Sequence, residues 1–119
     1  MWNDLQVDFS DSLLPTSIPL AESGGPYFLE ADQKLQLDGS ESKETDEYGF
    51  ILDYVWDLDG DGRYDDAKGS NPIVPWQFLT EELRLSLEQN HEISLRVMDD
   101  DYEWSKPSVS ILHLAEKTN

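Results

Sequence analysis

Five aspartates fall within one ten-residue stretch of the chain, residues 57–66 of the segment WDLDGDGRYDDAKG. They are Asp57, Asp59, Asp61, Asp65 and Asp66. Carboxylate oxygens are the hard ligands that calcium prefers, and about six to eight oxygens surround the ion at roughly 2.3–2.6 Å. The chemistry that these residues offer first is therefore cation binding.

The spacing matches most of an EF-hand calcium loop, in which positions 1, 3, 5, 7, 9 and 12 supply ligands and glycine stands at about position 6. The first five of these positions fall on Asp57, Asp59, Asp61, the Arg63 carbonyl and Asp65. Gly62 stands at the glycine position, but the last position is Lys68 rather than glutamate. Asp66 has to supply the missing ligand, and the segment leaves a strand where an EF-hand has helices.

The electrostatic repulsion between these carboxylates can be relieved in two ways. Each pair of charges about 6 Å apart costs roughly 0.7 kcal/mol in a water-like dielectric. A bound calcium ion removes that repulsion, and a mobile acidic turn built on Asp-Gly steps removes it as well. Both interpretations of residues 57–66 stay open from the sequence alone.

Composition narrows the classes of partner. The 119 residues hold 26 acids and 8 bases, for a net charge of -18, which repels nucleic acid and anionic membranes. The chain has no cysteine, hence no disulfide, and no apolar run approaches the roughly 20 residues that span a bilayer. Residues 1–17 lack the pattern of a signal peptide. The chain is either cytosolic or a piece of a longer exported protein.

The order of apolar and polar residues predicts mostly β-strands. Alternation at Leu35 and Leu37, in residues 51–58 and in residues 93–98 has the period of two that half-buried strands show. Residues 73–79 and 108–117 are further strand candidates. One short helical segment is predicted near residues 80–88, capped by Thr80, although its leucines also alternate as in a strand.

These elements predict an all-β fold, an antiparallel β-sandwich of about seven strands. We assign residues 18–119 to this domain and residues 1–17 to an N-terminal linker or arm. Trp56 is expected in the core. The isolated domain is expected to be a monomer.

Four landmarks carry a resemblance to a known family: GGPY, LQLDGSES, ILDYVWDLDGDG and ISLRVMDDD. Together they resemble the PKD (polycystic kidney disease) domain, an immunoglobulin-like module, over residues 18–115. The glycine usual near the family's last hairpin is missing from DDDYEWS. The resemblance implies a non-catalytic spacer or interaction module of an extracellular, cell-surface or periplasmic protein. Its partners are then neighbouring domains and a protein or polysaccharide ligand.

The same resemblance implies a second candidate calcium site. Some PKD-like modules bind calcium through a loop aspartate and the aspartate after the penultimate strand, and Asp46 and Asp99 match those positions. Residues 57–66 are expected at the opposite end of the sandwich, which makes the two sites independent. A solvated acidic rim that holds no ion is the other interpretation of this second cluster.

Two aromatic residues near the last hairpin, Tyr102 and Trp104, are candidates for contact with a sugar or a partner protein; packing in the core is the competing interpretation. We expect no enzyme, because no nucleophile elbow, phosphate loop or zinc-protease motif is present. The alternatives are a carbohydrate-binding accessory domain of a secreted hydrolase and, less in keeping with the sequence, a small hydrolase that uses acidic residues.

Overall fold

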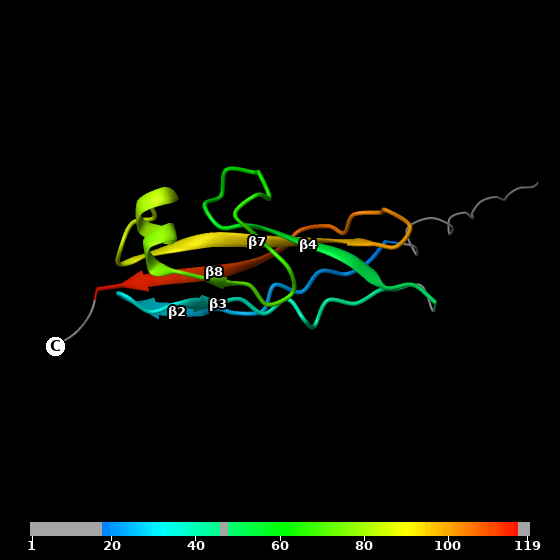
Figure 1. Cartoon of the computed structure of the whole chain (residues 1–119), viewed down its shortest axis with the longest axis horizontal. Coiled ribbons are helices and arrows are strands. Elements are labelled where there is room, and N and C mark those ends of the chain that lie inside the picture. The colour runs from blue at the N-terminus through cyan, green and yellow to red at the C-terminus, as the bar shows by residue number, and fades with distance from the viewer. Residues whose placement is uncertain (1–17, 46–47, 117–119) are drawn as a thin grey trace, which may run out of the picture.

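The computed structural model describes residues 18–45 and 48–116, so the expected arm of residues 1–17 lies outside the described residues. Two β-sheets pack against each other as a sandwich (Figure 1). The larger sheet has the strand order β2-β8-β7-β4-β5, and the smaller one pairs β3 with β6. The prediction of an immunoglobulin-like β-sandwich of about seven strands is confirmed. Within the described part of the chain, no helix is long and apolar enough to cross a bilayer.

Three long strands form the centre of the larger sheet. They are β4 (Ile51–Asp57), β7 (Gln89–Asp99) and β8 (Ser108–Ala115), paired antiparallel with β7 in the middle. Two short strands, β2 (Tyr27–Glu30) and β5 (Ala67–Lys68), form its edges. The long β7 therefore sets the length of the sheet.

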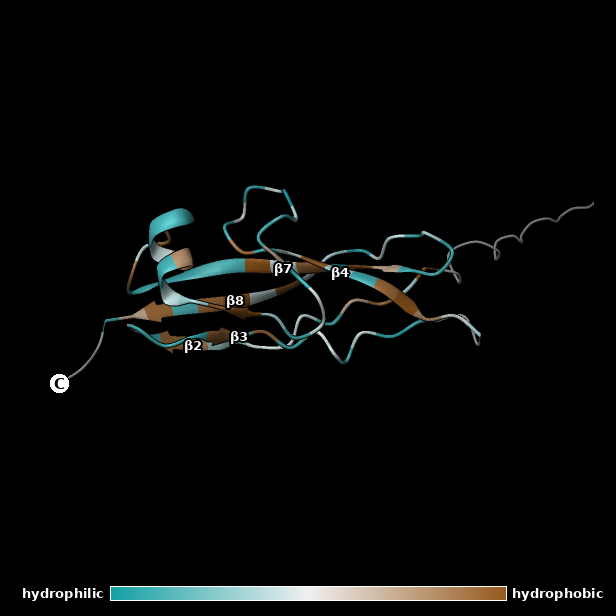
Figure 2. Cartoon of the chain, in the orientation of Figure 1, coloured by the Kyte–Doolittle hydropathy of each residue, from teal (hydrophilic) through white to brown (hydrophobic). Residues whose placement is uncertain are grey.

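Alternation along the strands divides core from surface, as predicted. On β7 the inward residues are Ile93, Leu95 and Val97, all buried. On the neighbouring strand Tyr54 and Trp56 face the same core, and Trp56 is fully buried. Figure 2 shows hydrophobic segments along the strands and hydrophilic ones in the loop that follows β4.

The smaller sheet covers that core from the other side. It consists of β3 (Leu35–Gln36) and β6 (Ile73–Val74), whose pairing continues through the N–H of Gly39 to the Ser70 carbonyl at 2.7 Å. Strand β6 is shorter than predicted because Pro75 follows it and cannot donate to a ladder.

One pair of strands departs from the predicted antiparallel pattern. Strand β2 runs parallel to β8, with Tyr27 opposite Leu112. The chain first pairs beside the smaller sheet, at the Leu20–Lys43 bridge, and then crosses to the larger sheet. This crossing places β2 at the edge next to the last strand.

The one short helical segment expected near residues 80–88 is present, but it begins and ends earlier in the chain. It is a short π-helix, η2 (Phe78–Glu82), closed by the N–H of Leu83 donating to the Phe78 carbonyl at 3.0 Å. Thr80 lies inside this element rather than capping it, and its hydroxyl donates to the Trp76 carbonyl at 3.0 Å.

The leucines after η2 explain its end. Leu83, Leu85 and Leu87 alternate with a period of two, and a helix cannot bring all three to one face. Arg84 takes a φ of 58°, outside the helical region, so that Leu85 can be buried. The segment is neither the helix nor the strand that its pattern allowed.

Candidate functional site

Asp57 anchors the acidic loop, which we define as residues 57–66. It ends β4, is only 4% exposed, and accepts N–H groups from Gly60 and Gly62 on its two carboxylate oxygens, both at 2.9 Å. These glycines have φ values of 74° and 84°, which glycine adopts without steric cost. The chain therefore folds back over the Asp57 carboxylate.

The acidic loop brings together four of its five aspartates. One carboxylate oxygen from each lies within 4.8 Å of the others in a set made of Asp57, Asp59, Asp61 and Asp66. Main-chain N–H groups hold the carboxylates, with Leu58 donating to Asp66 at 2.7 Å and Arg63 to Asp61 at 2.8 Å. Asp65 lies outside this set, although the sequence placed it among the ligands.

Burial, hydrogen bonding and contact between carboxylates shift the pKa values of three aspartates in the loop. Burial raises the pKa of Asp59 to about 6, and a hydrogen bond with Asp57 adds to the rise. Burial also raises the pKa of Asp66. The N–H of Arg63 lowers the pKa of Asp61. The loop thus concentrates negative charge that a cation can offset.

A contact that the sequence did not predict fastens the acidic loop to the sheet. Tyr64 folds over the outer face, where the Ser94 hydroxyl donates to its phenol oxygen at 3.0 Å. The Arg96 guanidinium lies 5.5 Å from the Tyr64 ring centre and 5.0 Å from that of Trp104. Ser94 and Arg96 alternate with the buried residues of β7, so the sequence predicts that they point outward. It does not predict which residues they contact.

Asp99 is the centre of the second cluster. It ends β7 and is 0% exposed. One carboxylate oxygen accepts the N–H groups of Asp101 and Glu103, at 3.0 and 2.9 Å. The other, Oδ2, is buried and has no hydrogen-bond partner among the described residues. A buried carboxylate oxygen without a partner carries a desolvation cost, which a bound cation would offset.

Glu44 and Asp100 join Asp99 in this cluster, with one carboxylate oxygen from each within 4.8 Å of the others. Gly49 permits the close approach, because a Cβ there would lie 2.9 Å from carboxylate atoms of both Glu44 and Asp100. Asp46, the predicted loop ligand, lies outside the described residues. The sequence placed Glu44 and Asp100 in the right loops without singling them out.

From the sequence we expected the two acidic clusters at opposite ends of the sandwich, and this expectation is wrong. Asp57 pairs with Ser94, well inside β7, which begins at Gln89. Strand β4 is thus too short to reach the far end, and Figure 1 shows the acidic loop projecting from the middle of the long axis. The Asp99 cluster lies at one end, where β7 turns toward β8.

The predicted aromatic pair is divided between two environments. Tyr102 lies at the tip of the last turn and is 74% exposed. Trp104 forms an isolated bridge with Met98, packs against Arg96 and is 36% exposed. The two side chains therefore do not share one burial environment, although both reach the surface.

Two more exposed aromatics lie in the adjoining loop. Tyr48 is 86% exposed and Phe50 is 58% exposed. The Asp100 N–H donates to the Phe50 carbonyl at 3.0 Å, and the Phe50 N–H donates to Asp100 Oδ1 at 3.3 Å. These bonds join the loop that contains Tyr48 to the turn that contains Tyr102.

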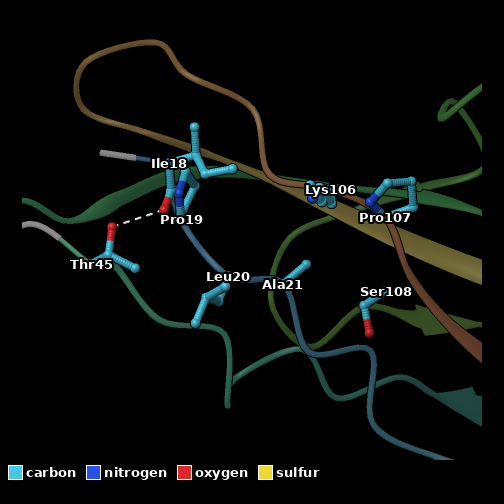
Figure 3. A pocket seen from close by; sticks show the side chains of 8 residues that line it. All are labelled: Ile18, Pro19, Leu20, Ala21, Thr45, Lys106, Pro107 and Ser108. Atoms are coloured by element: carbon cyan, nitrogen blue, oxygen red, sulfur yellow. Dashed lines mark hydrogen bonds between the residues drawn. The ribbon is translucent and has the colours of Figure 1, made fainter. Parts of the chain in front are cut away.

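Three hollows in the described surface offer no carboxylate pair. One of about 410 Å³ lies between the first described segment and the start of β8 (Figure 3). Its wall is mainly apolar, from Pro19, Leu20 and Pro107, and Thr45 donates to the Ile18 carbonyl at 2.8 Å. Asp66 is the only acidic residue that lines any of these three hollows, so they give the hydrolase alternative no support.

No family model and no curated protein matches the sequence. Solved structures match the fold. The chain is similar to fibronectin(III)-like modules of CbhA from Clostridium thermocellum, with a TM-score of 0.58 and 18% identity over 84% of this chain and 48% of that one. Carbohydrate-binding modules of the β-sandwich superfamily give a TM-score of 0.61 and 19% identity, over 88% of this chain and 37% of theirs.

A PKD domain from the KIAA 1837 protein gives a TM-score of 0.53 and 19% identity, covering 83% of this chain and 88% of that one. The chain spans less than half of the first two structures and most of this third one. These likenesses confirm the PKD-like immunoglobulin fold that the sequence motifs indicated.

Proposed function

We propose that this chain is a non-catalytic PKD-type module of an exported or surface multidomain protein, where it separates and contacts neighbouring domains. The structural neighbours support a non-catalytic role, since they are described as fibronectin(III)-like, carbohydrate-binding and PKD modules. The described chain begins near one end of the long axis and finishes at the other (Figure 1). A module of this form holds the domains on either side apart, by about 35 Å along β7 at roughly 3.3 Å per residue.

Calcium is the proposed stabilising ion, and the environment of the Asp99 carboxylate is the observation that supports it best. Its buried Oδ2 faces no hydrogen-bond partner among the described residues. Glu44 and Asp100 supply the further carboxylates that a hard cation needs. Calcium bound by these three residues would tie the end of β7 to the loop before β4.

The acidic loop is the second place proposed for calcium. Asp57, Asp59, Asp61 and Asp66 gather there with the spacing of a calcium loop. All four carboxylates also accept hydrogen bonds from main-chain N–H groups, so the loop has some order of its own. This is why the Asp99 cluster ranks first.

A calcium titration of the melting temperature tests both positions. Calcium that binds only the folded state adds about 2.7 kcal/mol at 100 times its Kd. We expect Asp99→Asn to lose most of the rise in melting temperature, and Asp59→Asn with Asp61→Asn to lose the smaller part. Glu92→Gln is the matched control, since it removes one negative charge from β7 outside both clusters. No rise with the unmodified protein would contradict the calcium proposal.

A carbohydrate-binding accessory domain is the alternative function. The likeness to carbohydrate-binding modules and the exposed aromatics favour it. It requires that Tyr102→Ala and Trp104→Ala weaken retention on an insoluble polysaccharide, and that Tyr102→Ala does so without lowering the melting temperature. Equal retention of these variants and the unmodified protein would argue against it.

A further inference from the structure

Exposed aromatic side chains are concentrated at one end of the sandwich. We define the aromatic loop end as Tyr48, Phe50, Tyr102 and Trp104. These four residues come from the loop before β4 and the turn after β7, and each is at least 36% exposed. In immunoglobulin-like sandwiches such loops meet at one end of the fold and form a natural binding surface. Tyrosine and tryptophan there give large contact areas at a low entropic cost.

Most of the charge around these aromatics is negative, although the Arg96 guanidinium lies over the Trp104 ring, 5.0 Å from its centre. Glu44, Asp100, Asp101 and Glu103 stand between or beside them in the same two segments. Asp100 also holds the two segments together through its bonds with Phe50. Aromatic faces next to carboxylates attract cationic groups through cation–π contact and charge.

Tyr102 occupies a backbone conformation that glycine would adopt with less strain. Its φ is 65°, in the left-handed region, at the turn where the sequence lacks the expected glycine. Its N–H closes the turn by donating to the Asp99 carbonyl at 3.0 Å, while its side chain stays 74% exposed. The exposed Tyr102 side chain is therefore available for contact with a partner, while the turn itself is closed by the main chain.

We propose that the aromatic loop end binds a cationic protein segment, in which lysine or arginine side chains alternate with apolar ones. This names the partner of the proposed interaction module and therefore rests on that function. A second copy of the chain fits the surface poorly, because it carries the same net charge of -18. Anionic partners are repelled for the same reason.

Fluorescence anisotropy with a labelled peptide of alternating lysine and leucine tests the proposal, in about 0.15 M salt, where the Debye length is about 8 Å. The double variant Tyr48→Ala, Tyr102→Ala is expected to weaken binding at least about fivefold. Phe28→Ala is the matched control, because Phe28 is 75% exposed on β2, outside the aromatic loop end, and its loss should leave binding unchanged. A peptide of alternating glutamate and leucine should not bind.

Tyr102→Gly separates binding from folding. This variant should keep or raise the melting temperature, since glycine accepts the φ of this position. It should still weaken binding of the lysine–leucine peptide. Equal binding by all variants, or an equal loss with Phe28→Ala, would overturn the proposal. Binding of cellohexaose at this end without binding of the lysine peptide would also overturn it and favour the carbohydrate alternative. The calcium-dependent rise in melting temperature should survive in Tyr102→Gly, so failure here leaves the calcium proposal standing.

Discussion

The hydroxyl of Ser94 donates to the phenol oxygen of Tyr64 at 3.0 Å, across 30 residues of sequence. Ser94 belongs to the central strand β7, and Tyr64 belongs to the acidic loop. This bond and the adjacent Arg96 guanidinium lay the loop against the outer face of the sheet. The acidic loop is thus fixed from outside as well as by its own main-chain hydrogen bonds.

Tyr64→Phe should lower the free energy of unfolding by about 0.5–1.5 kcal/mol, the usual net value of one hydrogen bond. The ring and its contact with Arg96 remain in this variant. Chemical denaturation measures the change. Tyr102→Phe is the control, because that phenol lies on a residue that is 74% exposed. Equal effects of the two variants would show that the Ser94 bond does not stabilise the fold.

Arg96→Ala should cost about 1–2 kcal/mol and change the fluorescence of Trp104. The guanidinium lies between two aromatic rings, and each cation–π contact contributes about 0.5–1 kcal/mol when partly exposed. Arg96→Lys should recover only part of the loss, since a planar guanidinium stacks better than an ammonium. Full recovery with lysine would contradict the stacked geometry.

Without calcium, Asp59 should make stability fall as the pH rises. Burial raises its pKa from 3.8 to about 6, so the folded protein binds more protons than the unfolded chain between these values. Stability from this group is fully present below the unfolded pKa and is lost as the pH rises through the folded one. In EDTA, the melting temperature relative to Asp59→Asn should therefore fall from about pH 4 to about pH 6. A difference that does not change with pH would show that Asp59 titrates normally.

Several strands were predictable from the sequence because the alternation of apolar and polar residues is enough to specify them. Ile93, Leu95 and Val97 alternate with polar residues, and burial of one face of β7 leaves no other solution. Leu83, Leu85 and Leu87 show the same period, yet they form no strand. Only Leu85 of the three is buried, and its burial depends on the turn at Arg84, which no local preference requires.

The two candidate sites also differ in whether a local sequence pattern could identify them. Asp57, Asp59 and Asp61 are close in sequence, so the acidic loop was identified from spacing alone. Glu44 meets Asp99 across 55 residues, and their meeting depends on how the loop before β4 sits against the end of β7. Such a cluster follows from strand pairing, which the sequence specified only coarsely.

Isothermal titration of calcium into the unmodified protein and into Asp99→Asn tests the central claim most directly. The asparagine keeps an oxygen for the Asp101 and Glu103 N–H groups and removes the buried negative charge. We predict that the unmodified protein binds calcium and that the strongest site disappears in Asp99→Asn. Calcium binding of equal strength in both proteins, or in neither, would contradict the claim that Asp99 holds the ion.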